Sequence, residues 1–226
     1  MSVAFDRKYY EVAPPDSVAE RLVIGARARI FRDFMSRMRP TPAERILDVG
    51  VSDVVSDAAN VLERSYPHRH NVTACGIGEG DEFQRAFPEI DYVRIQANTR
   101  LPFANRSFAI ATANAVLEHV GSPENQVLFV NELCRVAQRV FISVPNRFFL
   151  VEHHTALPVA HYQRHLFRAA CRIAGKSDWA REENLMFMTR KRLWELAATT
   201  TDRSAVVGYT GLLLGPLSSN LFLALH

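Results

Sequence analysis

The stretch Arg45-Ile46-Leu47-Asp48-Val49-Gly50 decides the fold of this chain. It is a short apolar run that ends in a glycine turn, which is typical of a strand buried on both faces of a sheet. Similar apolar runs recur as far as the end of the chain. We therefore expect further strands at 72–77, 92–95, 107–112, 139–144, 205–207 and 220–225.

Helical patterns fill most of the intervals between these strands. The first follows Pro14-Pro15, where Asp16 or Ser17 can cap it and Glu20 completes a capping box with Ser17, and it ends before Pro40. Its apolar residues recur at helical spacing and are Val18, Leu22, Ile30, Phe34 and Met38. The other predicted helices cover 54–66, 81–87, 124–137, 158–175 and 190–199.

The order of these elements predicts the architecture. Strands that alternate with helices at βαβ spacing form a parallel sheet with helices on both faces. The last two strands have no helix between them, so we expect them to form an antiparallel hairpin at one edge. Ligands in such folds bind beyond the carboxyl ends of the strands. The segments to inspect are 48–53, 76–81, 96–99, 113–119 and 145–155.

Composition and charge exclude several other classes of protein. The chain has 226 residues, of which 48% are hydrophobic and 23% charged, so we expect one globular domain over residues 1–226. Residues 1–42 form its N-terminal arm and helix. Three dispersed cysteines argue against a disulfide scaffold and favour a cytoplasmic location. A net charge of +3 is too small to indicate nucleic acid.

No membrane span is expected. The most apolar stretch, 211–226, is shorter than the roughly 20 residues that a spanning helix needs. Gly215 and Pro216 also interrupt it, so the stretch fits the final hairpin better.

Four segments resemble class I S-adenosylmethionine (SAM)-dependent methyltransferases of the methyltransferase domain 11 type. Ile46–Gly50 is similar to the start of that family's D-x-G-x-G-x-G loop. Leu101–Phe108 resembles its L-P-F-x-(D/N)-x-S-F entry to the fourth strand, and Asn114–Val120 its N-x-V-L-E-H segment. Glu132–Val136 resembles its E-x-x-R-V helix. The resemblance implies a Rossmann-like, seven-stranded, mostly parallel sheet with a C-terminal antiparallel hairpin.

The same resemblance implies SAM as the cofactor. A glycine turn admits the methionyl part, an acid after the second strand accepts hydrogen bonds from the ribose, and a polar residue after the third strand pairs with adenine. The cofactor-binding residues that it implies are Asp48, Gly50, Glu79 or Asp81, Asn98 and Asn114. For Asp48, capping of the following turn is the alternative.

The chain departs from the family pattern at several of these positions. Val51-Ser52-Asp53 replaces the later glycines of the loop, and Gly76 stands where the ribose acid is expected. Asn98 and Ala109 replace aspartates. For Asp53 two interpretations remain open: it attracts the cofactor's positive groups, or it caps a helix beginning near Val54.

The acceptor is expected after the fourth and fifth strands. Glu118 and His119 are the candidate catalytic pair, with a packed imidazole as the alternative. Residues 145–190 are expected to be a helical insertion that covers the acceptor pocket, with plain packing as the alternative. The candidate substrate-binding residues in it are Asn146, Arg147, His153 and His154.

Two other patterns in this insertion have less specific interpretations. His161 and His165 are four residues apart on a predicted helix, a spacing that suits a metal, but the H-E-x-x-H pattern is missing and we expect no metal site. A basic face is also predicted on this helix, which fits solvent or an anionic acceptor. Its residues are Arg164, Arg168, Arg172 and Lys176.

The sequence thus predicts a SAM-dependent methyltransferase that acts on a small-molecule or glycan-type acceptor, at oxygen or nitrogen. The alternative is a methyltransferase-like fold that has lost catalysis and serves as a binding or scaffold protein. The missing loop glycines and ribose acid favour this alternative, and the N-x-V-L-E-H segment favours the enzyme.

Overall fold

A computed structural model describes residues 18–53 and 59–226. Its centre is a seven-stranded sheet with the order β3-β2-β1-β4-β5-β7-β6. The strands are β1 (Ile46–Val49), β2 (Val72–Gly76), β3 (Asp91–Arg94), β4 (Phe108–Asn114), β5 (Ala137–Pro145), β6 (Ala205–Thr210) and β7 (Asn220–Leu225). The predicted fold class is confirmed.

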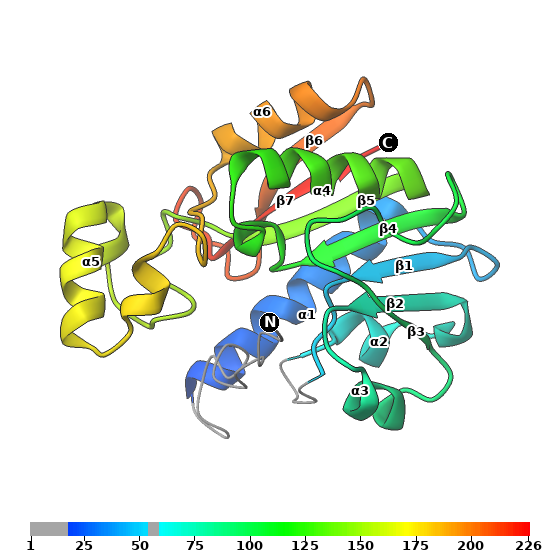
Figure 1. Ribbon diagram of the computed structural model, residues 1–226, viewed down its shortest axis with the longest axis horizontal. Helices are drawn as coiled ribbons and strands as arrows, with labels where there is room; N and C mark the ends of the chain where they lie inside the picture. The colour runs from blue at the N-terminus through cyan, green and yellow to red at the C-terminus, as the bar shows by residue number, and fades with distance from the viewer. Residues whose placement is uncertain (1–17, 54–58) are drawn as a thin grey trace.

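The strand directions follow the prediction as well. β1 pairs in parallel with β2 and β4, and β4 pairs in parallel with β5. β7 pairs antiparallel with both β5 and β6, so the last two strands form the expected hairpin at one edge. The carboxyl ends of β1, β2, β4 and β5 therefore meet at one edge of the sheet, which Figure 1 shows on the side of α5.

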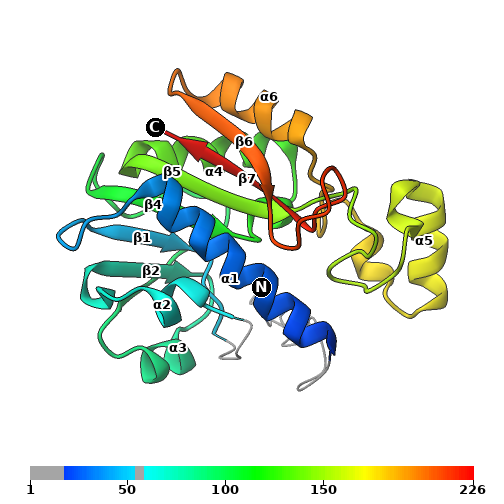
Figure 2. The same ribbon diagram turned by 180° about the vertical axis from the view of Figure 1, so that it is seen from behind.

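Helices cover both faces of the sheet (Figures 1 and 2). They are α1 (Val18–Met38), α2 (Val61–Ser65), α3 (Asp81–Ala86), α4 (Pro123–Val136), α5 (Arg164–Ile173) and α6 (Arg190–Thr200). Short 3-10 helices are η2 (Arg69–Asn71), η3 (Leu117–His119), η4 (Ala160–Tyr162) and η5 (Ser177–Ala180). Side-chain caps begin two of the helices, because Ser122 accepts from Asn125 N–H at α4 and Thr189 from Arg192 N–H at α6.

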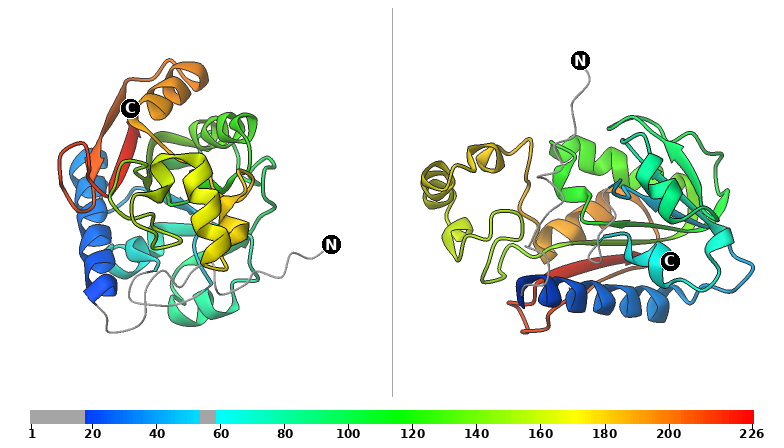
Figure 3. Two further views of the ribbon diagram at one scale, coloured as in Figure 1. Left: turned by 90° about the vertical axis from the view of Figure 1, so that its left-hand side faces the viewer. Right: turned by 90° about the horizontal axis from the view of Figure 1, so that it is seen from below.

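Two hydrophobic clusters explain why the strands read as continuous apolar runs. Successive residues of a strand point to opposite faces. Leu47 packs in the cluster that contains Leu133 of α4 and Leu196 of α6. Its neighbour Ile46 packs in the other cluster, with Phe34 of α1 and with side chains of α2 and α3. Figure 3 shows α1 lying along its face of the sheet.

The N-terminal helix matches the prediction over the residues that the structure describes. Ile30, Phe34 and Met38 are buried, whereas Leu22 is 49% exposed, so the expected apolar face does not reach it. Residues 1–17, with Ser17 of the expected capping box, lie outside the described residues. Of the predicted helix 54–66, residues 54–58 also lie outside them, and α2 covers only Val61–Ser65.

The segment 145–190 differs most from the expectation. Its helices are η4, α5 and η5, and irregular backbone connects them, so the prediction of a largely helical segment is wrong. The predicted helix 158–175 is interrupted at Gln163, which is extended with φ −124° and ψ 123°. His161 lies in η4 and His165 in α5, and the expected single helical face does not exist.

α5 stands beyond the carboxyl edge of the sheet (Figures 1 and 2). A small cluster of Phe167, Cys171 and Leu185 holds it to the following loop. Lys176 follows the end of the helix, and its ammonium donates to the Thr155 carbonyl, so Lys176 does not continue the predicted basic face.

Within the described residues, no helix is long and apolar enough to cross a membrane. Cys75, Cys134 and Cys171 are all free thiols.

Candidate active site

The turn after β1 requires glycine at position 50. Gly50 has φ +92°, a left-handed conformation that disfavours side chains. Its N–H donates to the Cys75 carbonyl over 2.7 Å, and a Cβ at this position would lie 2.3 Å from Val116 Cγ2. The turn after β1 is thus pressed against both β2 and the segment after β4.

Val51 fits the loop without the later glycines. Its backbone does not have the left-handed conformation, and its side chain packs against the hydrophobic cluster under α1, α2 and α3. The branched side chain therefore points into the core, and the strain that valine would suffer at positive φ does not arise.

Asp53 caps a helix other than the expected one. Its carboxylate accepts hydrogen bonds of 3.2 Å from the N–H groups of Gly80, Glu82 and Phe83. These N–H groups belong to the start of α3, where helix N-termini leave donors unpaired and favour negative charge. The β1 loop is thereby tied to the β2 loop.

The glycines after β2 serve the packing of Tyr92. The Tyr92 hydroxyl donates to the Gly78 carbonyl over 2.8 Å, and a Cβ at Gly80 would lie 2.3 Å from the Tyr92 ring. Glu79 is exposed and pairs with Arg94 over 2.6 Å, and Asp81 begins α3 at the surface. Glu79, one of the two candidate ribose acceptors, is therefore directed toward Arg94.

Asp48 lies beside a second buried acid. Its side chain is only 8% exposed, and Glu63 of α2 is fully buried. Burial, followed by the neighbouring Glu63 carboxyl, raises the pKa of Asp48 well above its usual range. Burial raises the pKa of Glu63 as well. One proton on the pair allows one carboxyl to donate to the other.

The two asparagines proposed for the cofactor have different surroundings. Asn98 lies in the loop after β3, is exposed and has φ +57°, a conformation that asparagine tolerates better than most residues. Asn114 ends β4, and its Oδ1 accepts a hydrogen bond from the Ser143 hydroxyl. Asn98 therefore keeps its amide at the surface, whereas Asn114 links two strands.

Four acidic and imidazole side chains meet after β4 and β5. Glu118 and His119 lie in η3, and Glu152 and His154 lie in the loop after β5. The two Nε2 atoms of His119 and His154 are 3.0 Å apart. His154 Nδ1 lies 2.9 Å from Glu152 Oε1, and His119 Nε2 lies 3.9 Å from Glu118 Oε1. We call these four residues the His–Glu cluster.

The hydrogen-bond partners fix where protons sit in this cluster. His119 Nδ1 lies 2.7 Å from the Asn184 carbonyl, which only accepts, so His119 donates there and its Nε2 carries the lone pair. His154 Nε2 then donates to His119. His154 Nδ1 donates to the Glu152 carboxylate, which leaves the His154 ring with two N–H groups.

The ionisation of the cluster members differs sharply. Burial raises the pKa of Glu118 to about 7 and, with the charge of His154, lowers the pKa of His119 to about 4. Glu152 is also buried, but hydrogen bonds from His154 and Thr155 lower its pKa to about 2. At neutral pH the cluster therefore contains an ionised Glu152, a neutral His119 and a Glu118 near its titration point.

Neighbouring residues hold the cluster in place. The ring of Trp179 lies 4.7 Å from that of His154, centre to centre, at an angle of 30°. Glu152 also accepts from the N–H and the hydroxyl of Thr155, both over 2.6 Å. Met186 N–H donates to the Glu118 carbonyl, so the end of the 145–190 segment is joined to η3.

Two of the other proposed substrate residues, Asn146 and Arg147, donate hydrogen bonds to carbonyls outside this cluster. Asn146 is 4% exposed, and its amide donates to the carbonyls of Pro216 and Ser218 over 3.0 and 2.8 Å. Arg147 donates to the Tyr162 carbonyl over 3.2 Å. His153 lies next to the cluster in sequence, and burial, followed by the charge of His154, lowers its pKa to about 4. The geometry gives Asn146 a structural role.

Sequence reasoning did not single out Glu152 of the cluster, nor its neighbours Thr155, Trp179 and Asn184. These residues reach the site through the folding of the 145–190 segment, which no periodic pattern predicts. A signal for Glu152 exists in the run Glu152-His153-His154-Thr155, where an acid and a hydroxyl flank two imidazoles.

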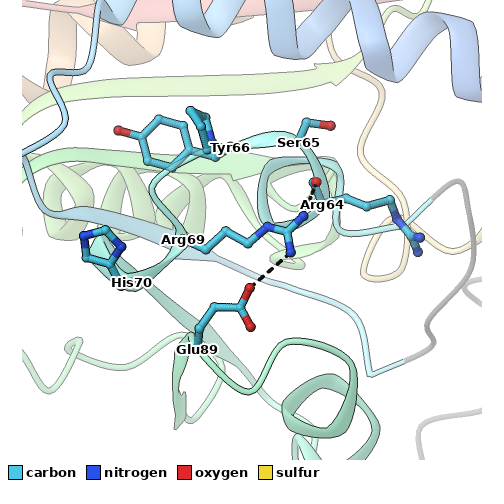
Figure 4. A pocket seen from close by; sticks show the side chains of 7 residues that line it. Arg64, Ser65, Tyr66, Arg69, His70 and Glu89 are labelled. Carbon is cyan, nitrogen blue, oxygen red and sulfur yellow. Dashed lines mark hydrogen bonds and ion pairs between the residues drawn. The ribbon is translucent and has the colours of Figure 1, made fainter.

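A surface hollow elsewhere does not contribute to this site. It is lined by residues of α2, η2 and the loop before β3, at the amino end of β2 (Figure 4). Arg69 spans it, because its guanidinium donates to the Arg64 carbonyl over 2.7 Å and pairs with Glu89 over 3.1 Å. The hollow is on the opposite edge of the sheet from the His–Glu cluster.

Solved structures with the same fold include SAM-dependent methyltransferases. One from Thermotoga maritima, a possible histamine N-methyltransferase, has 13% identity and a TM-score of 0.57 over 91% of this chain and 92% of its own. One from Mesorhizobium loti has 12% identity and a TM-score of 0.57 over 88% of this chain and 99% of its own. PigF with S-adenosylhomocysteine (SAH) has 16% identity and a TM-score of 0.55 over 97% of this chain and 62% of its own.

No family model matches the chain. No curated protein matches its sequence either. At 12–16% identity the likeness to the solved structures concerns the fold. The chain therefore has the fold of class I SAM-dependent methyltransferases, and its cofactor and acceptor are matters for proposal.

Proposed function

We propose that this protein is a cytoplasmic methyltransferase that moves the methyl group of SAM to a small-molecule or glycan-type acceptor, at oxygen or nitrogen. The observation that carries the proposal is the His–Glu cluster, which lies at the carboxyl edge of a sheet shared with SAM-dependent methyltransferases. Ligands bind at this edge in α/β folds.

The residues around the carboxyl edge divide between cofactor and acceptor in this proposal. Gly50 admits the methionyl part of SAM, and Asn98 meets the adenine with its exposed amide. Asp48, Asn114 and either Glu79 or Asp81 complete the cofactor side. Tyr92 and Asp53 hold the glycine loops in the shape that receives the cofactor.

Methyl transfer is a displacement at the sulfonium carbon of SAM. Alignment of the acceptor with that carbon supplies much of the acceleration. An acceptor hydroxyl or amine also has to lose a proton, and His119 Nε2 is the proposed base, because Nδ1 is committed to the Asn184 carbonyl. The proton of the acceptor would replace the hydrogen bond that Nε2 receives from His154. Glu118 lies beside it and receives or releases a proton near neutral pH.

The segment 145–190 is the proposed lid over the acceptor. It supplies Glu152 and His154 to the cluster, and α5 extends beyond the carboxyl edge of the sheet (Figure 3). Arg147 and His153 are the candidate substrate residues in it. The exposed part of α5 carries Arg168 and Arg172, which would suit an acidic acceptor.

A scaffold function is the second candidate, and specific contacts favour it. Asp53 occupies the N–H groups at the start of α3, Glu79 is paired with Arg94, and Asp48 is paired with Glu63. Each of these acids is thereby engaged within the protein. The two candidates differ in whether the protein turns over SAM.

Turnover of SAM with a panel of hydroxyl and amine acceptors separates the two candidates. We expect His119→Gln to lower kcat by about 10²- to 10⁴-fold, the usual contribution of a general base, with SAH affinity unchanged. His165→Gln is the matched control, because His165 is exposed on α5. Equal turnover in wild type and His119→Gln would contradict the catalytic role, and absence of turnover with every acceptor would favour the scaffold.

A further inference from the structure

Glu118, His119 and His154 have the composition and spacing of a metal site. We propose that these three side chains bind one divalent transition-metal ion of the Zn²⁺ type. The ligand atoms that they offer lie within 4.8 Å of one another. Two imidazoles and one carboxylate, with a remaining open position, form a common ligand set of catalytic zinc sites.

The distances between the ligand atoms suit a tetrahedral ion. Zinc–nitrogen bonds of about 2.0–2.1 Å place two tetrahedral ligands about 3.3 Å apart. The Nε2 atoms of His119 and His154 are 3.0 Å apart, and Glu118 Oε1 lies 3.9 Å from His119 Nε2. These two distances lie on either side of the required separation, so small side-chain rotations would complete the site.

Glu118 supplies an independent reason to expect a ligand. Its side chain is 1% exposed, and neither carboxylate oxygen has a hydrogen-bond partner among residues 18–53 and 59–226. A buried carboxylate without donors is costly, and proteins retain such groups where something else satisfies them. The nearby His119 Nε2 carries a lone pair and does not donate to Glu118. A cation between Glu118 and the imidazoles would satisfy both carboxylate and ring nitrogen.

The outer partners of both histidines match those of metal ligands. Metal-binding histidines usually donate their second N–H to a carboxylate or a backbone carbonyl. His154 Nδ1 donates to Glu152, and His119 Nδ1 donates to the Asn184 carbonyl. Both rings are thus oriented with Nε2 directed toward the shared point.

Charge and protons balance when the ion binds. In the ion-free arrangement one N–H lies between the two Nε2 atoms. The ion displaces that proton to solvent, as metals do when they bind protonated ligands, and both Nε2 atoms become donors of a lone pair to the metal. The ionised Glu118 and Glu152 then match the two positive charges. The His119 side chain is 31% exposed, which leaves a path for entry.

The ion would act on the acceptor, and this part of the inference rests on the proposed function. An acceptor hydroxyl at the open position would lose its proton more readily, because a bound cation lowers the pKa of a coordinated oxygen. In the ion-bound protein, His119 and Glu118 therefore act as ligands, and coordination replaces direct proton removal by His119. Oxygen acceptors are favoured over amines in this case.

Cobalt titration of the untagged, chelator-treated full chain tests the metal site. We expect visible d–d absorption that saturates at one Co²⁺ per chain and that Zn²⁺ abolishes by competition. Glu118→Gln and His154→Gln should each weaken Zn²⁺ binding at least about tenfold, and Glu152→Gln by about 10- to 100-fold, the usual effect of an outer partner. His165→Gln should bind as the wild type does, because His165 is exposed on α5.

Three results would overturn the metal site. One is a wild-type chain without d–d absorption at equimolar Co²⁺, a measurement that needs no variant. The second is Zn²⁺ affinity unchanged in folded Glu118→Gln and His154→Gln, and the third is loss of binding in His165→Gln. SAH binding by the chelator-treated protein is measured separately, so failure of the metal site and failure of the methyltransferase proposal are distinguishable.

Discussion

Asp48 and Glu63 form a buried acid pair at the end of the first strand. Both carboxyl groups are almost removed from water, and burial raises both pKa values. A group whose pKa is higher in the folded state contributes stability below its unfolded pKa and loses that contribution as pH rises through its folded pKa. The pair therefore weakens the fold as pH rises from the acid range toward neutrality.

Glu63→Gln should stabilise the protein at neutral and higher pH. The amide removes one negative charge and provides a donor for Asp48. We expect the unfolding free energy at pH 8 to rise by about 1–3 kcal/mol, the usual cost of a buried polar group without a hydrogen-bond partner. Melting temperature should rise by about 2–4 °C per kcal/mol. The gain should shrink as pH falls, because a proton on the wild-type pair then removes the same negative charge.

Thermal melts of wild type and Glu63→Gln from pH 5 to 8 measure this difference. Glu195→Gln is the control, because Glu195 is half exposed and forms only a 3.8 Å surface pair with Lys191. A Glu63→Gln protein less stable than wild type at pH 8 would show that the Glu63 carboxylate stabilises the fold.

Asp53 shows how one residue replaces a missing glycine loop. Glycine at this position would leave the N–H groups at the start of α3 to other acceptors or to water. Asp53 instead accepts from three N–H groups there and fixes the distance between the β1 and β2 loops. The shape of this region therefore depends on a single carboxylate rather than on backbone freedom.

At the scale of elements, Asn146 joins the exit of β5 to the loop before β7. Its amide donates to two carbonyls of that loop, and its Oδ1 accepts from the Phe148 N–H over 3.1 Å. The hairpin and the start of the 145–190 segment are thereby held together.

Asn146→Asp should destabilise the protein without a specific effect on substrate. The variant loses both donors and places a carboxylate against two carbonyls. We expect a loss of about 2–3 kcal/mol, because a buried group left without its partner costs about 1–3 kcal/mol, the Ser218 carbonyl is such a group, and the new carboxylate lies against it. The melting temperature should fall by about 4–12 °C.

Differential scanning calorimetry measures the fall in melting temperature of Asn146→Asp, and Asn105→Asp is the control. Asn105 is exposed and accepts a hydrogen bond from Arg135, which an aspartate can also accept. If Asn146→Asp is as stable as the wild type but binds the acceptor more weakly, Asn146 is a substrate-binding residue and the structural account is wrong.

The sheet was predictable because its signals are local. Each strand is a continuous apolar run, and Ile46 and Leu47 face opposite layers as such runs imply. The break of the predicted helix 158–175 at Gln163 was not predictable, because helical spacing continues across it and tertiary contacts decide the backbone there. His161 is held by the Phe149 carbonyl instead of pairing with His165.

The site was predictable only in part. Glu118, His119 and His154 were expected on the acceptor side, and the structure brings them together. Other contacts around the carboxyl edge join residues that are distant in sequence: Asn184 is 65 residues from His119, and Asp53 is 27 residues from Gly80. Such contacts arise from the packing of loops, for which a single sequence carries no periodic signal.

At the scale of the whole molecule, the fold brings the polar side chains of the carboxyl edge together from the ends of separate strands. The β1 and β2 loops lie on the cofactor side in the proposed function, and η3 with the 145–190 segment lies on the acceptor side. Helices cover both faces of the sheet, and the loops that follow the parallel strands lie together at this edge (Figure 1). The proposed reaction requires both sides to be filled at once.

SAH binding tests the central claim most directly. Calorimetric titration of the full chain with SAH should give one site per chain. A ligand at a hundredfold excess over Kd adds about 2.7 kcal/mol to the stability of the native state, so the melting temperature should rise with SAH concentration. One-site binding with a rising melting temperature is the result that the account predicts. Absence of both heat and thermal shift at millimolar SAH would contradict it and leave a methyltransferase-like scaffold.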